Sequence, residues 1–298
     1  MPERTVAVTG ANGFVGSALL QTFADAGWQV IALTRRPLAD LPIEWRRYDL
    51  LDDSLPAGLF AGVDVLVHCA YARRRPGLDA IATNVRASKL LFDAARATGT
   101  KQLIFVSSLA ADEHALSEYG RQKFRIEQML DPNADTVVRA GLVLGNGGLF
   151  ARMQAYLRRR SLVPLIDGGR QPVQTVDVDD LSCCILKIAE QDLTGLFTIA
   201  DYPGMTYEQF YRLLAASVHV PVRFVSLPFW VFDAGLRAAE VLRIPLPIDR
   251  DNLLGICTAE IRTTTPFSTF GVDPQTPAQA IERDRTLETG ARNRRPED

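Results

Sequence analysis

The chain of 298 residues has few of the residues that hold metals or disulfides, with 4 cysteines and 3 histidines. The cysteines are Cys69, Cys183, Cys184 and Cys257. They show neither CxxC spacing nor a histidine at ligand spacing. Neither a metal site nor a disulfide framework is therefore predicted.

The sequence also lacks an excess of charge and a long apolar run. Its net charge is −2, with basic and acidic residues interspersed, so the basic footprint of a nucleic-acid-binding protein is absent. The best candidate for a membrane span, residues 227–246, contains four charged residues and is too polar to span a bilayer. The first strand is expected within a few residues of the start, which leaves no room for a signal peptide, so a cytoplasmic location is expected.

The first half of the chain instead alternates short apolar runs with helical patterns. Strands are predicted at residues 5–8, 29–33, 63–67, 102–106 and 136–138, and helices at 14–26, 79–98 and 119–130. Several strand runs are continuously apolar, as is typical of strands buried on both faces. This alternation predicts an α/β fold with a Rossmann-type doubly wound parallel sheet.

After about residue 141 the pattern becomes irregular, and turn residues increase. A helix over 178–189 and a strand over 196–199 are predicted to complete the nucleotide-binding domain. The predicted organisation is an NAD(P)-binding domain over residues 1–166, completed by about 173–200, and a smaller C-terminal substrate-binding lobe over 201–281. The charged segment 282–298 lacks apolar periodicity and is predicted to be a disordered tail.

A glycine-rich turn follows the first predicted strand and leads into the first predicted helix. Gly10 permits the tight turn, Gly13 lets the backbone approach a pyrophosphate, and Gly16 lets helix and strand pack closely. The N-terminus of the helix offers N–H groups and a positive dipole end to phosphate oxygens. The residues predicted to contact a dinucleotide are Thr9, Gly10, Asn12, Gly13, Phe14, Val15 and Gly16. A tight turn without a ligand is the alternative.

The second predicted strand is followed by Thr34, Arg35 and Arg36. An NAD-preferring site usually has an acidic residue here, whereas an arginine accommodates a 2′-phosphate. NADP is therefore favoured over NAD, with solvated surface arginines as the alternative interpretation. Asp49 and Leu50 are predicted to flank the adenine, unless Asp49 is simply a solvated turn residue.

A second cluster of polar residues comes after the strand predicted at 102–106. Tyr119 and Lys123 are four residues apart on a predicted helix, so both side chains lie on one helical face. A nearby cation stabilises phenolate and lowers the pKa of a tyrosine, and the lysine can also reach ribose hydroxyls. Ser108, at the carboxyl end of the strand, can hold a substrate oxygen while Tyr119 donates or removes a proton.

Further motifs occur in a fixed order along the chain: His68-Cys69-Ala70 at a strand end, Asn84 in a helix, Arg139 and the segment 176–181. With the glycine turn and the serine, tyrosine and lysine, this order resembles the extended short-chain dehydrogenases/reductases, the superfamily of nucleotide-sugar epimerases and dehydratases.

The resemblance implies a role for each matching residue. Tyr119 would be the general acid/base, Lys123 would position the ribose and tune Tyr119, and Ser108 would orient the substrate oxygen. Asn84 would support the lysine through the local hydrogen-bond network. Three residues after a neighbouring strand would border the cofactor: Cys69, Ala70 and Tyr71. A homodimer through the helices predicted at 79–98 and 119–130 is the assembly that the resemblance suggests.

The sequence departs from the epimerase pattern at two positions. Residues 140–143, directly after Arg139, contain no side-chain amide, and Gln174 and Thr175 stand before Val176, where a diphosphate-clamping arginine is usual. Arg170 lies somewhat earlier. The basic cluster 73–75 could attract an anionic substrate or be a solvated loop.

The expected activity is hydride transfer at an alcohol or carbonyl carbon of a small-molecule substrate, with NADP or NAD as cofactor. The first expectation is a nucleotide-sugar epimerase or dehydratase, which the resemblance favours. The arginines after the second strand favour an NADPH-dependent carbonyl reductase. A non-catalytic, dinucleotide-binding assembly or regulatory factor is the third alternative.

Overall fold

The computed structural model describes residues 4–38, 43–72, 79–160, 162–242, 244 and 248–283. The chain divides into two compact units. The first, here called the sheet unit, comprises Met1–Ala140, Leu181–Ile199 and Thr265–Val272, and the second unit comprises Gly141–Asp180, Ala200–Thr264 and Asp273–Asp298. The arginine cluster 73–75 and residues 284–298 of the predicted tail lie outside the described residues.

The sheet unit contains a parallel sheet of seven strands in the order β11-β6-β5-β4-β1-β2-β3. The predicted Rossmann-type doubly wound sheet is therefore confirmed. Its strands are β1 (Thr5–Thr9), β2 (Gln29–Thr34), β3 (Glu44–Arg47), β4 (Val65–His68), β5 (Gln102–Ser108), β6 (Thr136–Ala140) and β11 (Gly195–Ile199). The sequence did not predict β3, an edge strand in which three of the four residues are charged, because it has no apolar run.

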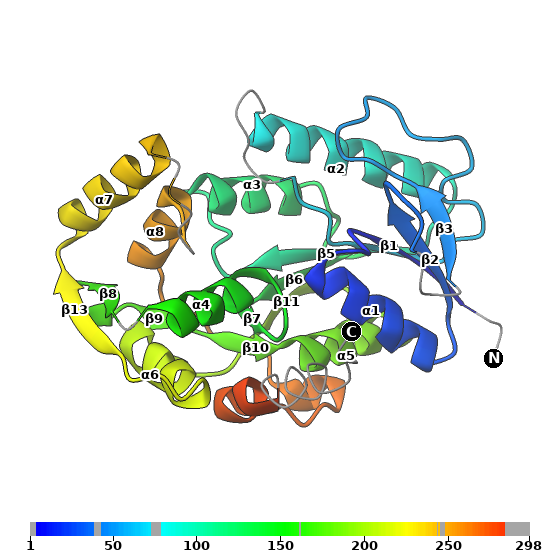
Figure 1. Ribbon diagram of the computed structural model, residues 1–298. Coiled ribbons are helices and arrows are strands. Elements are labelled where there is room, and N and C mark those ends of the chain that lie inside the picture. Colours follow the sequence, from blue (N-terminus) through cyan, green and yellow to red (C-terminus); the bar gives the residue numbers. More distant parts are fainter. Residues whose placement is uncertain are drawn as a thin grey trace, which may run out of the picture. The chain divides into compact units, whose positions relative to one another are not determined.

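Helices cover both faces of this sheet. Figure 1 shows α1 (Phe14–Asp25) and α5 (Val178–Glu190) on one face, and α2 (Ala80–Ala97) and α3 (Glu118–Glu127) on the other. The helix predicted at 119–130 ends at Glu127, because the next residues form a turn in which the Leu130 N–H donates to the Glu127 carbonyl. The remaining element, a 3₁₀ helix, spans Phe267–Phe270.

Buried side chains of α2 and β5 contribute to the core of the sheet unit. Leu91 and Phe92 of α2 pack with Leu103 and Phe105 of β5, and all four are at most 1% exposed. The rings of Phe92 and Phe105 meet edge to face at 6.3 Å. Each such side chain contributes about 1.5–3 kcal/mol on burial, so this packing fixes α2 against the sheet.

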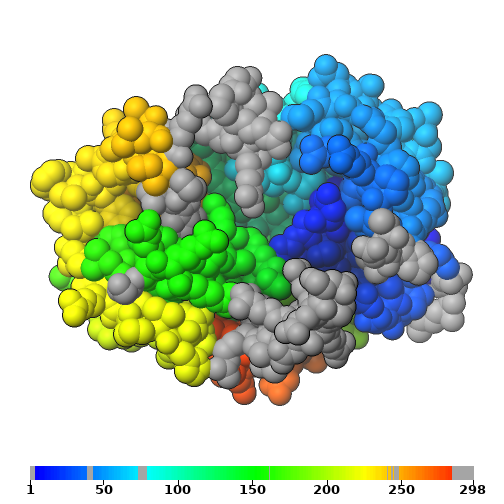
Figure 2. Space-filling model, in the orientation of Figure 1, coloured from blue at the N-terminus to red at the C-terminus, as the bar shows by residue number. Residues whose placement is uncertain are grey.

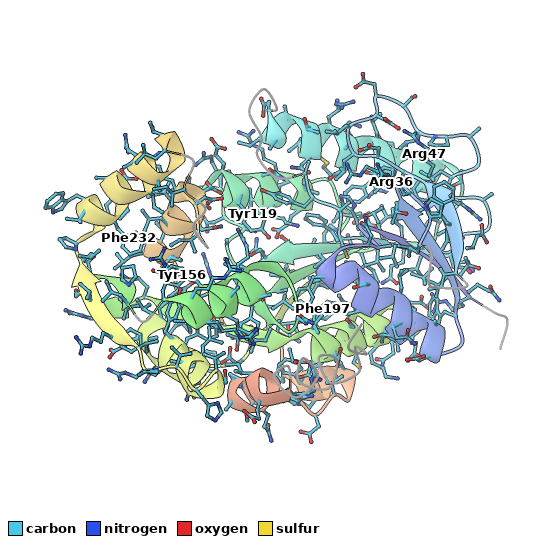
Figure 3. The ribbon with its side chains drawn as sticks, in the orientation of Figure 1. Arg36, Arg47, Tyr119, Tyr156, Phe197 and Phe232 are labelled. Carbon is cyan, nitrogen blue, oxygen red and sulfur yellow. The ribbon has the colours of Figure 1, made fainter. Side chains whose placement is uncertain are left out.

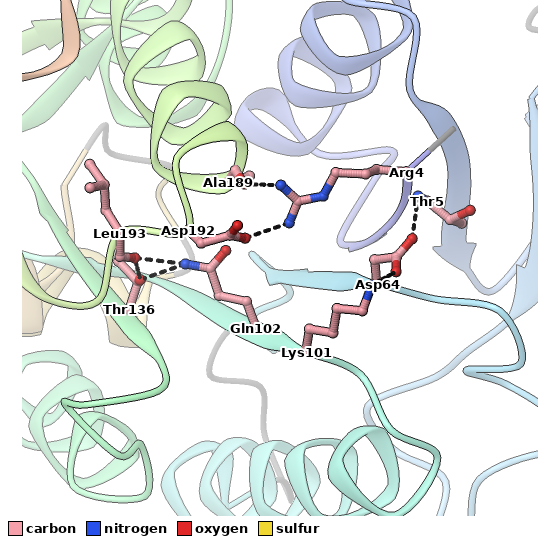
Figure 4. A network of polar contacts seen from close by, with 9 residues as sticks. All are labelled: Arg4, Thr5, Asp64, Lys101, Gln102, Thr136, Ala189, Asp192 and Leu193. Carbon is pink, nitrogen blue, oxygen red and sulfur yellow. Dashed lines mark hydrogen bonds and ion pairs between the residues drawn. The ribbon is translucent and has the colours of Figure 1, made fainter. Parts of the chain in front are cut away.

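Polar side chains join the strands at their amino ends (Figure 4). The Arg4 guanidinium, directly before β1, donates to the Ala189 carbonyl at 2.7 Å and to Asp192 at 2.6 Å. Gln102, at the start of β5, and Thr136, at the start of β6, both donate to the Leu193 carbonyl, at 2.7 and 2.6 Å. The links at this end are structural, and the carboxyl ends of the strands carry the residues predicted to bind ligands.

The second unit contains short strands and amphipathic helices. Its sheets have two strands each: β7 with β10 and β8 with β13, both parallel, and β9 with β12, antiparallel. The strands are β7 (Leu142–Leu144), β8 (Leu162–Ile166), β9 (Pro172–Val173), β10 (Thr175–Asp177), β12 (Met205–Thr206) and β13 (Arg223–Leu227). The labelled helices are α4 (Gly148–Arg159), the 3₁₀ helix η1 (Asp167–Gly169), α6 (Tyr207–Ser217), α7 (Phe229–Val241) and α8 (Arg250–Cys257). Residues 277–283 are also helical.

The helices α4 and α6 lie side by side on the surface shown in Figure 2, α4 in green and α6 in yellow-green. Phe150 of α4 and Phe210 of α6, both fully buried, meet with their ring centres 6.2 Å apart. Within the described part of the chain, no helix combines the length and the apolar character that a bilayer crossing would need.

Candidate active site

The glycine turn after β1 is packed too tightly for side chains. Gly10 has φ +65°, and a Cβ there would lie 2.9 Å from the backbone nitrogen of Ala70. A Cβ at Gly16 would lie 2.2 Å from the Gly10 carbonyl oxygen, well inside van der Waals contact. The first turn of α1 therefore packs directly on the loop, as the spacing of the glycines predicts.

The N-terminus of α1 has the features of an anion site. Gly13 is the N-cap residue, so no side chain caps the helix, and no acidic residue lies in the first turn. Asn12 and Gly13 are exposed, and Phe14 and Val15 are partly exposed. The first N–H groups of the helix are thus left for an outside acceptor, and a helix N-terminus of this kind favours phosphate oxygens.

A buried hydrogen-bond chain connects the turn to the loop after β4. The Thr9 hydroxyl oxygen accepts from the N–H groups of Cys69 and Ala70, at 3.0 and 3.1 Å, and lies 2.7 Å from Nδ1 of His68. Because a hydroxyl has two lone pairs and one proton, its proton goes to Nδ1. Nε2 of His68 then donates to the Ser88 hydroxyl at 2.9 Å. This chain fixes the loop predicted to border the cofactor.

The sequence singled out His68 only as part of a motif, and Ser88 not at all. The register that pairs Thr9 with His68 on adjacent strands is the signal that could have linked them. Burial, and to a smaller extent the Lys123 charge, lower the pKa of His68 to about 3. The imidazole is therefore neutral at physiological pH.

Acid should destabilise the fold through this histidine. Since the pKa falls from 6.5 in the open chain to about 3 in the fold, the unfolded state binds the extra proton between these values. The contribution of the neutral His68 to the free energy of unfolding is therefore fully present above about pH 6.5 and decreases as the pH falls below this value. Between pH 6.5 and 5 the free energy of unfolding should drop by about 2 kcal/mol more in the wild type than in His68→Gln. Urea denaturation at both pH values measures this, with exposed His114→Gln as the control, and equal pH dependence in wild type and His68→Gln would contradict it.

The predicted serine, tyrosine and lysine all lie at or after the carboxyl end of β5. Ser108 ends that strand, and its hydroxyl accepts from the Ala110 N–H at 3.2 Å. The next helix, α3, starts close to this loop, because a Cβ at Gly120 would lie only 2.3 Å from the Ala110 carbonyl oxygen. Tyr119 is therefore in the first turn of a helix that packs against the Ser108 loop (Figure 3).

Lys123 is held in place by its surroundings. Its Nζ donates to the Val106 carbonyl at 2.7 Å, lies 4.5 Å from the centre of the Phe105 ring and 5.8 Å from the centre of the Tyr119 ring. Burial lowers the pKa of Lys123 to about 8, against the opposing influence of Cys69 and Glu127. At neutral pH the group is still mainly an ammonium ion, and its charge favours the phenolate form of Tyr119.

Tyr71, in the loop after β4, contacts Tyr119, the predicted general acid/base. Its ring meets the ring of Tyr119 edge to face, with the centres 5.4 Å apart. The residue comes two positions after Cys69, whose thiol pKa is raised to about 12 by burial, so that the thiol is neutral. The structure thus joins the loop predicted to border the cofactor to the predicted catalytic helix.

Asn84 of α2 holds that same loop. Its Oδ1 accepts from the Ala72 N–H at 2.8 Å, while its Nδ2 donates to the carbonyls of Ala72 and Ala80, at 2.9 and 2.7 Å. These bonds use both amide protons. The observed contacts assign Asn84 a part in shaping the loop, and the support of Lys123 that the resemblance implies stays a prediction.

The sequence missed a buried ion pair beside β5. The Arg139 guanidinium binds Glu127 through Nη2 at 2.6 Å and through Nε at 3.0 Å, which raises the pKa of Arg139. The Ser107 hydroxyl donates to the same carboxylate at 2.5 Å. Glu127 thereby joins α3 to β5 and β6, one helical turn after Lys123. Nothing local in the sequence indicates this partner, because the residues meet only through the sheet.

The end of β2 presents two arginines. Arg35 and Arg36 are exposed, and the Thr34 hydroxyl donates to the Arg36 carbonyl at 2.6 Å. Figure 3 labels Arg36 and also Arg47. Arg47 lies in the adjacent strand β3, where the strand register pairs it with Thr34 of β2. Two hydrogen bonds fix this strand end, because the Trp45 indole N–H and the Tyr48 backbone N–H both donate to the Thr34 carbonyl.

The residues predicted to flank the adenine follow β3. The Asp49 carboxylate accepts from the Leu51 N–H at 3.0 Å, which makes a local turn, and Leu50 packs against the core of the sheet unit. Their contact with a cofactor stays a prediction. In the part of the chain that the structure describes, no group of three or more His, Cys, Asp or Glu side chains is placed to hold a metal ion.

Comparisons with known proteins bear on the family and the fold. The profile of the NAD dependent epimerase/dehydratase family matches residues 6–200. A ceramide reductase of Caulobacter vibrioides is 30% identical over 250 residues, which cover 80% of this chain and 76% of the relative.

Solved structures share the fold at low sequence identity. A UDP-glucose 4-epimerase of Thermotoga maritima, crystallised with UDP-glucose, is similar at a TM-score of 0.75 and 19% identity, over 96% of this chain and 99% of that chain. A human epimerase family protein with NADPH gives a TM-score of 0.73 and 19% identity, over 95% of this chain and 99% of that chain. By fold and by the match over residues 6–200, the chain belongs to the NAD dependent epimerase/dehydratase family.

Proposed function

We propose that this protein is an NADPH-dependent reductase of a carbonyl compound, with Tyr119 as the proton donor. The observation that carries the choice of net reduction is the exposed pair Arg35 and Arg36 at the end of β2, where an acidic residue would favour NAD. The guanidinium groups provide the fork geometry that a 2′-phosphate binds best.

The remaining cofactor contacts follow from the same strand ends. The turn from Thr9 to Gly16 would hold the pyrophosphate at the N-terminus of α1, and Lys123 would bind the ribose hydroxyls of the nicotinamide half. The loop residues Cys69, Ala70 and Tyr71 would border the nicotinamide ring. When bound, the cofactor supplies a hydride to the carbonyl carbon of the substrate.

The residues of the chain would supply the proton and hold the carbonyl group. The Ser108 hydroxyl donates a hydrogen bond to the carbonyl oxygen and fixes its position. Tyr119 Oη transfers its proton to that oxygen as negative charge develops there. The Lys123 ammonium, held by the Val106 carbonyl, stabilises the phenolate that remains on Tyr119.

Two positions of the second unit favour a substrate other than a nucleotide sugar. Gln174 stands where a diphosphate-clamping arginine is usual, and its amide is used internally: Nε2 donates to the carbonyls of Asp201 and Arg262, and Oε1 accepts from the Arg262 N–H. At Gly141, where an asparagine would lie nearby, a Cβ would come within 2.6 Å of the Gln174 carbonyl oxygen. The ceramide reductase relative also supports net reduction.

A nucleotide-sugar epimerase or dehydratase is the second candidate, and the fold shared with UDP-glucose 4-epimerase supports it. In an epimerase the cofactor is regenerated within each turnover, so no net NADPH is consumed. Steady oxidation of NADPH, followed by absorbance with a panel of ketones and aldehydes, separates the two. An enzyme that converts a nucleotide sugar without net oxidation would overturn the reductase proposal.

Replacement of Arg35 and Arg36 should weaken the binding of NADPH and leave the binding of NADH nearly unchanged. In Arg35→Ala/Arg36→Ala the KM for NADPH is expected to rise by about 10- to 100-fold, because charge-assisted bonds to the 2′-phosphate are lost. The KM for NADH should stay within about twofold, since NADH has no such phosphate. The exposed Arg125 of α3 provides the control variant Arg125→Ala. Equal losses for the two cofactors would show that the arginines do not select the phosphate.

A further inference from the structure

The second unit contains a pocket between two separate hydrophobic clusters. One cluster includes Met153 of α4 and Leu165 of β8, and the other includes Ile166 together with Phe232 of α7. The pocket between them has an empty volume of about 410 Å³, including its opening to solvent. The pocket is therefore open to solvent, and a small molecule can reach its lining.

The lining of the pocket disfavours charged ligands. Of its twelve described lining residues, eight are apolar and none is charged, so a phosphate or carboxylate would lose its hydration without compensation. Tyr207 and Tyr211, one turn apart on α6, both line it. Burial raises the pKa of both phenols, so they are neutral hydrogen-bonding groups.

One lining residue, Gln171, has a side-chain oxygen without a hydrogen-bond partner. Oε1 of Gln171 is buried and accepts no hydrogen bond. The backbone carbonyl of the same residue accepts from the Tyr207 N–H at 3.0 Å, which fixes Gln171 against the start of α6. A buried acceptor without a donor is unfavourable, and a ligand with an N–H or O–H group would remove this defect.

We propose that this pocket binds a neutral, mainly apolar molecule whose single N–H or O–H group donates to Gln171 Oε1. The apolar part of the ligand fills the gap between the two clusters and restores the dispersion contacts that a gap forfeits. The uncharged lining excludes a nucleotide diphosphate from this pocket. The inference concerns the second unit alone and does not depend on the proposed reductase activity.

Binding can be measured directly with N-phenyl-1-naphthylamine, a neutral fluorophore with one N–H group that brightens in apolar surroundings. The full-length wild type is expected to bind it saturably. Ile256→Trp, which fills the pocket from α8, should weaken binding at least tenfold. Ile261→Trp makes the same exchange at an exposed position outside the lining and should bind like the wild type. Circular dichroism and the Tm of each variant establish that it is folded.

The role of Gln171 is tested by competition with two small ligands of similar length. Octanamide has N–H donors and methyl octanoate has none, so octanamide should displace the fluorophore at lower concentration. Gln171→Met, which removes the acceptor at similar volume, should weaken octanamide about tenfold and leave methyl octanoate unchanged.

Three outcomes would overturn the proposal. They are absence of saturable binding by the wild type, unchanged binding by a folded Ile256→Trp, and equal effects of Gln171→Met on both competitors. Should Ile256→Trp fail to fold, the competition with Gln171→Met decides alone. Tyr119→Phe should bind the fluorophore like the wild type, so failure of the reductase proposal would leave this result unchanged.

Discussion

Replacement of Tyr119 by phenylalanine is expected to lower kcat/KM by about 10²- to 10⁴-fold, the usual contribution of a general acid. The variant removes the only atom of this side chain that can transfer a proton, and it keeps the ring that meets Tyr71 edge to face. The affinity for NADPH, measured by fluorescence titration, should change little, because the proposed phosphate and ribose contacts are made by other residues.

The matched control is Tyr202→Phe, the same exchange at an exposed tyrosine of the second unit, which should keep the wild-type rate. A folded Tyr119→Phe with full turnover would remove Tyr119 from the mechanism. Tight dinucleotide binding without turnover on any carbonyl compound or nucleotide sugar, in wild type and variant alike, would favour the assembly-factor alternative.

Lys123→Met should lose activity and gain stability at the same time. Burial lowers the pKa of Lys123 from 10.5 to about 8, so at pH 7 the fold carries an ammonium ion that the unfolded chain solvates better. Each pKa unit corresponds to about 1.4 kcal/mol, which gives a penalty of about 3 kcal/mol. Loss of the hydrogen bond to Val106 offsets about 1 kcal/mol. The variant should therefore be about 2 kcal/mol more stable at pH 7.

The sign of this effect gives it a characteristic pH dependence. Between pH 8 and 10.5 the unfolded chain binds the proton that the fold has released, so the stability of the wild type rises with pH in this range. The advantage of Lys123→Met over the wild type should accordingly disappear near pH 10. Urea denaturation at pH 7 and pH 10 measures it, with exposed Lys89→Met as the control. If Lys123→Met were less stable than the wild type at pH 7, the buried charge of Lys123 would not lower the free energy of unfolding, and the prediction would be wrong.

Activity should fall by about 100-fold or more in Lys123→Met, because the phenolate of Tyr119 loses the cation that stabilises it. Stabilisation together with loss of turnover would identify Lys123 as a residue kept for chemistry. A stable variant with full turnover would contradict the proposed role.

The central sheet could be predicted because its strands are continuous apolar runs and its helices have clear start signals. Asp79 and Ser117, for example, cap α2 and α3, because their side-chain oxygens accept hydrogen bonds from backbone N–H groups of the first turn. The edge strand β3 escaped prediction because Glu44, Arg46 and Arg47 give it a polar pattern, and only pairing with β2 makes it a strand. In the second unit, strands of two or three residues are too short to show periodicity.

In the candidate site, too, local patterns could be predicted from the sequence and contacts between distant residues could not. The spacing of Tyr119 and Lys123 is local, so the sequence predicts that they share a helical face. The partners of Arg139 and His68 are not local: Glu127 lies 12 residues away and Ser88 lies 20 residues away, and the sheet brings each pair together. The homodimer, the cytoplasmic location and the cofactor contacts stay predictions.

The polar links at the amino ends of the strands have a consequence for how this protein can diversify. Arg4, Gln102 and Thr136 hold the sheet together at one end, while the residues proposed to bind ligands occupy loops at the other. Loops beyond a rigid scaffold tolerate change better than the scaffold itself. A lineage could therefore alter its substrate by exchanging residues beyond the carboxyl ends and keep its margin of stability, which makes this sheet a frame on which new specificities can evolve.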